Sequence, residues 1–326
     1  ANSIRSALLH RYRPDIWSVE ANGERFVGMT LMEMARHCVQ DAGIRTAGQS
    51  RPELASLALT PGYGTRSSGL HTTTDFVNVL ADVANKTLRA AYDQAPRTYL
   101  PFARRATAPD FKPINRMQLG EAPALLKKNE HGEFVRGTIG DAKETYGLVT
   151  YGRVFGITRD VVVNDDLEAF TRIPALFGMA AAQKESDVVW SILLANAAMG
   201  DGTALFHANH GNLKASGSGA PSVATVGAAR AAMAKQTGLD GSTILNVMAR
   251  YLIVPVELEV AAEQLVTSIT PAQTSNAVPQ SIRSLTPIAE PRLSVGITLD
   301  GAAISGSATA WYLAASPDQI DTVEYA

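Results

Sequence analysis

The longest helical pattern in the chain covers residues 164–202. Pro174 lies inside it, and proline is tolerated in the first turn of a helix but not further along. The pattern therefore predicts a short helical turn, a bend near Ile173 and a long rod over 174–199. At 1.5 Å per residue the rod would be roughly 39 Å long. Side-chain oxygens suited to capping the helix start are those of Asn164, Asp165 and Asp166, and the predicted stop is formed by Gly200 and Gly202.

Polar residues interrupt this rod between two apolar stretches. The run consists of Gln183, Lys184, Glu185, Ser186 and Asp187. Consecutive positions cover the whole circumference of a helix, and charged groups in a dry core cost several kcal/mol unless they are paired. We therefore expect at least one side of the rod to lie at a surface or against another chain.

Three segments before the rod carry different patterns. Residues 1–72 carry short helical and loop signals without a strong core pattern, so we expect this segment to become ordered by lying on something else. Residues 73–94 predict a helix that is capped at Thr74 or Asp75 and stopped by Pro96. Residues 111–158 alternate with turn signals and predict a long two-stranded antiparallel excursion. Because an isolated hairpin is marginal in water, this excursion needs a partner surface, and a neighbouring copy would supply one.

The chain after the rod predicts a second lobe of mixed topology. It comprises a helix over 223–236, a strand over 250–258, a helix over 259–267, and two further strands in 288–294 and 308–316. No internal repeat is visible, which excludes solenoids and propellers.

Composition limits the function. With 326 residues and 46% apolar content the chain can bury a sizeable core, and its length suggests two domains. A formal net charge of -2 gives no reason to expect wrapping of nucleic acid, and no apolar run could span a bilayer. The single cysteine, Cys38, excludes an internal disulfide framework.

Sequence motifs for common chemistry are missing. There is no phosphate-binding Walker pattern and no Gly-x-Ser-x-Gly elbow, so we expect no cofactor and no esterase activity. His207 and His210 have a spacing that zinc could use, and Asp201 is nearby, which leaves a zinc hydrolase as an alternative. Loop histidines bonded to backbone carbonyls are the favoured interpretation, and we predict no metal site.

Positive charge is concentrated on and just before the excursion. The residues are Arg104, Arg105, Lys112, Arg116, Lys127, Lys128 and Arg136. A solvated hairpin face is the default interpretation. The second is a set of ion pairs between subunits, with Glu185 and Asp187 as acceptors. DNA contact is a minor option because glutamates are interleaved.

Several stretches resemble one viral family. DDLEAFTRIPALFGMAAAQKESDVVWSILLAN, followed by GDGTALFHANHGNL, is similar to the capsid part of phage proteins made as a prohead protease fused to a major capsid protein. RYLIVPVELEVAAEQL, EPRL and AWYLAA also match this group, which is similar to Mu-like head subunits. The resemblance covers most of residues 73–326 and implies the HK97-type (Johnson) fold of tailed-bacteriophage major capsid proteins.

The fold that this resemblance implies is of the α+β class. Its expected parts are an N-terminal arm (1–72), a helix leading into the peripheral domain (73–96), the extended loop with peripheral-domain strands (97–158), the spine helix and peripheral domain (159–222), the axial domain (223–310) and a return to the peripheral domain (311–326).

The function implied is a non-enzymatic head subunit that self-assembles in the bacterial host cytoplasm. Hexamers and pentamers would form an icosahedral shell around double-stranded DNA, with portal, scaffold, prohead protease and cement proteins as further partners and no membrane. Ala1 would be the N-terminus left by a maturation protease. An encapsulin-like nanocompartment shell is the alternative from the same fold.

Overall fold

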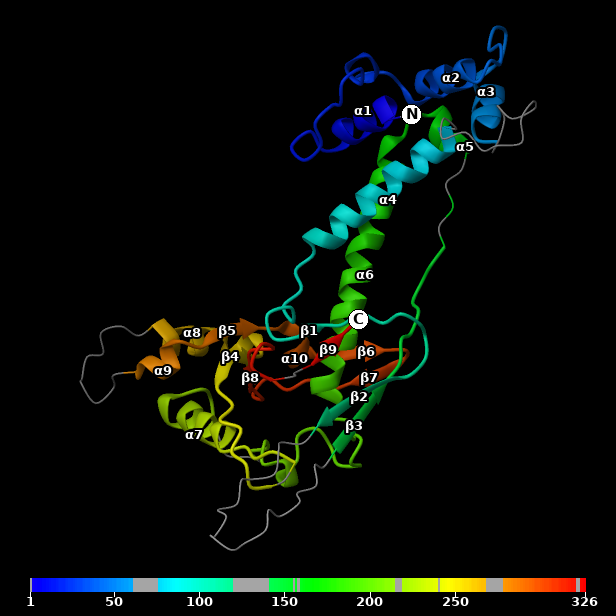
Figure 1. Ribbon diagram of the computed structural model, residues 1–326. Coiled ribbons are helices and arrows are strands. Elements are labelled where there is room, and N and C mark those ends of the chain that lie inside the picture. Colours follow the sequence, from blue (N-terminus) through cyan, green and yellow to red (C-terminus); the bar gives the residue numbers. More distant parts are fainter. Residues whose placement is uncertain are drawn as a thin grey trace, which may run out of the picture. The chain divides into compact units, whose positions relative to one another are not determined.

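The computed structural model describes residues 2–60, 76–119, 141–154, 156, 159–214, 219–239, 241–267, 278–320 and 323–326. In these residues the chain is mixed α+β, as expected, and it divides into two units. The first unit comprises 1–96 with 152–184, and the second comprises 97–151 with 185–326. The longest helix, α6 (Leu167–Ala195), contributes residues to both units (Figure 1). The finer six-part organisation stays a prediction.

The first unit is helical. Its elements are α1 (Asn2–Tyr12), η1 (Glu24–Phe26), α2 (Leu31–Asp41), α3 (Arg51–Ala58), α4 (Phe76–Gln94), α5 (Arg159–Val163) and the first part of α6. Leu8, Leu31, Leu54, Phe76 and Val162 are buried in one shared core. The described part of residues 1–72 is therefore ordered by packing on other elements, as expected, and these elements lie within the same chain. Its partners, α4 and α5, belong to the same chain but lie too far away in sequence to appear in a local pattern.

The start of α6 differs from the prediction. The helix runs over 29 residues with Pro174 inside it, so it does not begin at that proline. Proline removes one helical hydrogen bond, and the buried position of Pro174 shows that packing outweighs this loss. Asp165 does not cap its own helix. It has a left-handed φ of 55°, and its carboxylate accepts a 2.6 Å hydrogen bond from the amide of Leu31 at the start of α2.

The end of α6 also comes earlier than predicted. The helix stops at Ala195, because Asn196 adopts a left-handed φ of 44°. Its side-chain amide makes two bonds to the backbone of Phe206: Nδ2 donates to the carbonyl at 3.2 Å and Oδ1 accepts from the amide at 2.6 Å. The side chain of asparagine thus takes the stopping role that we had assigned to Gly200 and Gly202.

A three-stranded sheet forms the centre of the second unit. β4 (Ala249–Val254) lies between β5 (Thr286–Ala289), to which it is parallel, and β8 (Tyr312–Ala315), to which it is antiparallel. Leu252 and Val254 belong to one buried cluster, and Ile253 belongs to the other together with Trp190. Successive residues of β4 therefore serve opposite faces of the sheet.

Short elements complete this unit. They are β1 (Arg104–Arg105), β2 (Ile114–Leu119), β3 (Asp141–Tyr146), η2 (Ala208–His210), α7 (Val223–Ala234), η3 (Val256–Leu258), α8 (Glu259–Thr267), α9 (Gln280–Arg283), α10 (Pro291–Val295), β6 (Ile297–Leu299), β7 (Ala302–Ile304) and β9 (Glu324–Tyr325). β1 pairs in parallel with β9, and β6 pairs with β7 in an antiparallel arrangement.

The predicted helices corresponding to α4, α7 and α8 are confirmed over their described residues, whereas the expected cap at Thr74 or Asp75 lies outside these residues. Two strands needed correction. The strand expected over 250–258 ends at Val254 and gives way to η3. The strand expected over 288–294 ends at Ala289, because Glu290 accepts a bond from the amide of Arg292 and starts helix α10. Pro291 suits the first position of that helix.

Candidate assembly site at the base of the ribbon

The base of the predicted excursion is confirmed as a two-stranded ribbon, the paired strands β2 and β3 (Figure 1). The strands are antiparallel with Ile114 opposite Tyr146 and Arg116 opposite Glu144. Since side chains alternate between faces, Arg116, Glu144 and Tyr146 share one face of the ribbon. The predicted tip of the excursion lies outside the described residues.

One carboxylate holds both strands of this ribbon. Glu324 Oε2 accepts from Arg116 Nε at 2.6 Å and from the hydroxyl of Tyr146 at 2.8 Å. The bond from Glu324 raises the pKa of Arg116, and burial, with a further contribution from Glu324, raises the pKa of Tyr146. Glu324 belongs to β9, which is itself paired with β1. The C-terminal strand therefore fixes the base of the ribbon.

A second contact on the same face involves Glu144. Both of its carboxylate oxygens accept from the amide of Gly200, at 2.9 and 3.0 Å. A Cβ at Gly200 would lie 2.2 Å from the Lys143 carbonyl oxygen, so only glycine allows this approach. The loop that follows α6 is thereby placed against β3.

His210 stabilises that loop through both of its ring nitrogens. Its Nδ1 bonds to the Leu205 carbonyl at 3.1 Å and its Nε2 bonds to Asp201 Oδ2 at 2.9 Å. Both partners can accept, so the protonated ring, in which both nitrogens donate, satisfies the two bonds together. The Asp201 bond is the main cause that raises the pKa of His210, and the same bond lowers the pKa of Asp201.

This geometry bears on the zinc alternative. A doubly protonated imidazole has no lone pair for a metal, and Nδ1 of His207 accepts from the amide of Asn209 at 3.2 Å. The favoured interpretation, a loop histidine bonded to a backbone carbonyl, is confirmed for His210. Within the described residues, no group of three or more His, Cys, Asp or Glu side chains is placed to hold a metal ion.

A buried charged network lies at the second half of α6. The side chain of Glu290 is fully buried; its Oε2 accepts from the hydroxyl of Thr98, and its Oε1 accepts from Arg292 Nη1 at 3.0 Å. Arg292 Nε donates to Asp187 Oδ1 at 2.5 Å. Trp190 Nε1 donates to the Thr98 hydroxyl at 3.2 Å. The network therefore joins α6, the start of α10 and the segment before β1.

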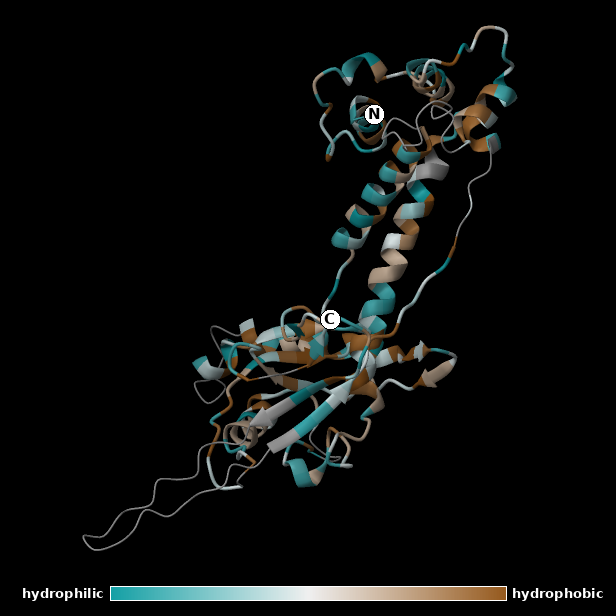
Figure 2. Cartoon of the chain, turned by 45° about the vertical axis from the view of Figure 1, so that its right-hand side comes forward, coloured by the Kyte–Doolittle hydropathy of each residue, from teal (hydrophilic) through white to brown (hydrophobic). Residues whose placement is uncertain are grey.

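The polar run of α6 takes part in this network, and Figure 2 shows it as a teal band along the helix. Glu185 accepts from the hydroxyl of Tyr99, and Asp187 accepts from Arg292. Ser186 is buried. Both acidic side chains that we had considered as acceptors for another subunit thus have partners within their own chain.

Comparison with known protein families matches residues 142–326 to the family described as phage capsid protein. No curated protein and no solved structure matches the chain. The matched region is more than half of the 326 residues. The chain belongs to the phage capsid protein family.

Membership in this family decides the broad role. A phage capsid protein is a structural protein that self-assembles into a shell, and its place is the virion capsid. The matched region contains the ribbon contact Glu144, the loop pair of Asp201 and His210, and the network around Glu290. Among the described helices of this phage capsid protein, none has both the length and the apolar content needed to cross a bilayer.

The basic residues predicted for an interface are only partly brought together. Arg104 and Arg105 form the exposed strand β1, Lys112 Nζ lies 3.6 Å from Asp110, and Arg116 binds Glu324. Lys127, Lys128 and Arg136, together with Ala1, lie outside the described residues. An interface role for this set stays a prediction.

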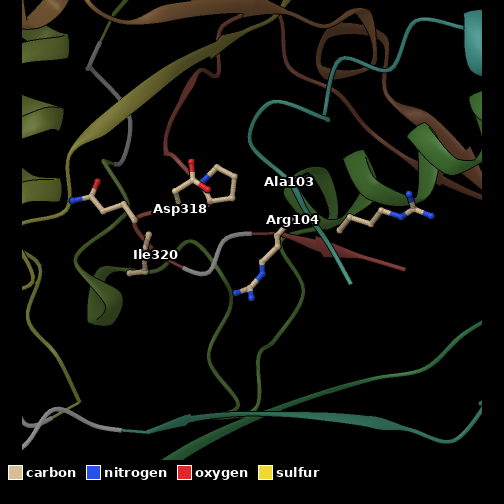
Figure 3. A pocket seen from close by; sticks show the side chains of 7 residues that line it. Ala103, Arg104, Asp318 and Ile320 are labelled. Carbon is tan, nitrogen blue, oxygen red and sulfur yellow. The ribbon is translucent and has the colours of Figure 1, made fainter. Parts of the chain in front are cut away.

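Arg104 lines an open hollow of about 680 Å³ between β1 and residues 317–320. Figure 3 shows its side chain across this hollow from Ile320, with Asp318 beside them. The sequence offered no signal for this hollow or for Glu324, because both depend on pairing between strands that are far apart in the chain. The capping role of Glu290 could have been inferred from the proline that follows it.

Proposed function

We propose that this phage capsid protein is the major capsid subunit of a tailed double-stranded DNA bacteriophage with the HK97-type fold, from the prohead protease fusion and Mu-like group. Copies assemble in the host cytoplasm through hexamers and pentamers into an icosahedral shell. The shell encloses the genome without reading its sequence, consistent with a formal net charge of -2. Portal, scaffold, protease and cement proteins are its further partners.

The observation that carries this proposal is the anchored ribbon. Two strands alone bury too little surface to be stable in water, yet Glu324 and Gly200 hold the base of β2 and β3 in a defined position. A two-stranded ribbon that is fixed at its base and has no third strand among the described residues is suited to contact neighbouring copies. Closed rotational contacts of this kind produce rings from one type of chain.

The alternatives are separated by different observations. A nanocompartment shell would form similar particles that enclose enzymes, so the content of the particle distinguishes it. A zinc hydrolase is disfavoured because both ring nitrogens of His210 are already bonded, to the Leu205 carbonyl and to Asp201.

Negative-stain microscopy of the purified protein tests the proposal. We expect closed shells tens of nanometres across, and particles from infected cells should contain DNA. Deletion of residues 118–140 should leave folded subunits that do not assemble, whereas Glu263→Ala, which alters an exposed residue of α8, should still give shells. Normal shells from the deletion variant would contradict the role of the ribbon.

A further inference from the structure

The chain leaves the ribbon through a segment whose backbone makes no hydrogen bond to the backbone of any other described residue. The β2–β3 ladder ends at Ile114 and Tyr146. Beyond it, residues 147–150 make no backbone–backbone hydrogen bond with any described residue. A Cβ added at Gly147 would meet no atom within 4 Å. Among the described residues, the amides and carbonyls of this stretch thus have no backbone partner.

The composition of this stretch favours a strand. Leu148, Val149 and Thr150 include two β-branched residues, which are enriched in sheets. Val149 is 70% exposed, and Phe111, on the other strand just beyond the end of the ladder, is 73% exposed. These residues favour a strand, yet they are exposed and have no described neighbouring strand. Pairing with a strand from outside the subunit would remove this conflict.

Both ends of the stretch are held. On one side Tyr146 is bound to Glu324, and on the other the hydroxyl of Tyr151 donates to Asp300 Oδ2 at 3.0 Å. Asp300 lies in the turn between β6 and β7 and has a positive φ of 51°. A segment fixed at both ends loses less conformational entropy when a partner strand adds to it.

From these observations we propose that residues 147–150 form a docking edge that pairs, backbone to backbone, with a strand edge from a second copy of this chain. The inference rests on the proposed shell function, since a shell supplies second copies at high local concentration. Backbone pairing would provide the affinity, and the exposed side chains of Phe111 and Val149 would be covered in the contact. Such pairing would also protect an edge that otherwise invites aggregation.

Hydrogen exchange by mass spectrometry tests this edge. We expect all amides of residues 148–150 to exchange at near-intrinsic rates in unassembled subunits, and those on the paired edge to exchange at least ~10-fold more slowly in shells. In parallel, a cysteine introduced by Val149→Cys should react with maleimide in subunits and be shielded in shells; the natural Cys38 is buried.

A matched pair of variants separates backbone pairing from side-chain effects. Thr150→Pro removes the backbone N–H of residue 150. Thr150→Val keeps this N–H and has a side chain of similar shape. Both variants should melt at the wild-type temperature as subunits, because this amide makes no backbone bond within the described chain. We expect shell yield to fall at least ~10-fold for Thr150→Pro and to stay unchanged for Thr150→Val. The N–H of residue 149 points to the opposite edge of the strand. If that edge makes the pairing, Val149→Pro and Val149→Thr should show the same contrast.

The outcomes distinguish this inference from the proposed function. Shells whose 148–150 amides exchange as fast as in subunits would overturn the docking edge and leave the shell function intact. Protection that appears only when a different protein is added would also overturn it, because the occupant would not be a second copy. Failure of the wild-type protein to form any shell would refute both.

Discussion

Gly178 of α6 lies so close to Leu88 of α4 that a Cβ at residue 178 would be 2.2 Å from the Leu88 carbonyl oxygen. It would also be 3.0 Å from the amide nitrogen of Tyr92. No side chain fits at such distances, so the two helices approach each other at a contact that only glycine allows. This close contact between backbones fixes how α4 and α6 pack within the first unit.

We therefore predict that Gly178→Ala destabilises the protein although alanine is the better helix former. The added methyl group must push the helices apart, which costs about 1–3 kcal/mol. Chemical denaturation followed by far-ultraviolet circular dichroism measures the loss. Gly227→Ala in α7 is the control, because a Cβ there meets no atom within 4 Å, and it should be neutral or stabilising by up to ~1 kcal/mol. Equal effects of the two substitutions would contradict the argument.

The buried network provides a second prediction. Glu290→Ala removes a fully buried carboxylate and leaves Arg292 and Thr98 without this acceptor. Leaving buried donors without their acceptor costs about 1–3 kcal/mol, and Arg292, whose side chain is 24% exposed, keeps its bond to Asp187. The midpoint of denaturant unfolding should fall accordingly, and Trp190 fluorescence should report the change, since its indole bonds to Thr98. Glu263→Ala, on the exposed side of α8, should shift stability by no more than ~0.5 kcal/mol. A change at Glu290 as small as that at Glu263 would refute the importance of the network.

These two contacts illustrate what sequence patterns can and cannot reveal. Period-3.6 spacing predicted α4 with its end at Gln94, because the buried residues of that helix recur at helical intervals from Phe76 to Thr87. The same reasoning placed a helix start at Pro174, since it judged proline by its lost hydrogen bond alone. The burial of that proline comes from packing, which no window of sequence displays.

The candidate site was less predictable than the helices. The ribbon was visible from alternation and turn signals, but its anchors come from distant parts of the chain: Glu324 is 208 positions from Arg116, and Gly200 is 56 positions from Glu144. Charge alone drew attention to Lys112, whose pair is exposed. Contacts between such distant residues form only in the folded chain, and they leave no periodic pattern in the local sequence.

A third prediction concerns the Glu324 anchor. Glu324→Ala should free both Arg116 and Tyr146, so the β2–β3 amides should exchange faster, by about 3- to 10-fold, while the β4 amides are unchanged. Hydrogen exchange with peptide-level resolution measures this difference. Shell yield should also fall, because the ribbon would no longer be held in one orientation.

The matched control for this anchor is Lys112→Ala. Its ion pair to Asp110 is near the ribbon but is exposed and joins residues only two positions apart. It should leave exchange in β2 and β3 at the wild-type rate. If the two variants showed the same exchange rates in β2 and β3, Glu324 would not hold the ribbon in place.

The last prediction is a pH dependence of the loop after α6. Asp201 raises the pKa of His210 above its ordinary value of about 6.5, so the stability that this histidine contributes is complete below that value and is lost as pH rises through the raised pKa. The pKa of Asp201 is lowered below about 3.9, so its contribution holds above that value and is lost as pH falls through the lowered pKa. The pair should therefore stabilise the loop most between about pH 4 and 6.5.

Asp201→Asn tests this window. The variant keeps an oxygen that can accept from the Thr203 amide but removes the negative charge that faces His210. Nuclear magnetic resonance should show the titration midpoint of the His210 ring moving downward, and the melting temperature should fall below that of the wild type at pH 5 to 6. The two proteins should converge at pH values above the raised pKa of His210, where the ring is neutral in both. An unchanged His210 midpoint in the variant would show that the Leu205 carbonyl, and not Asp201, holds the proton on the ring.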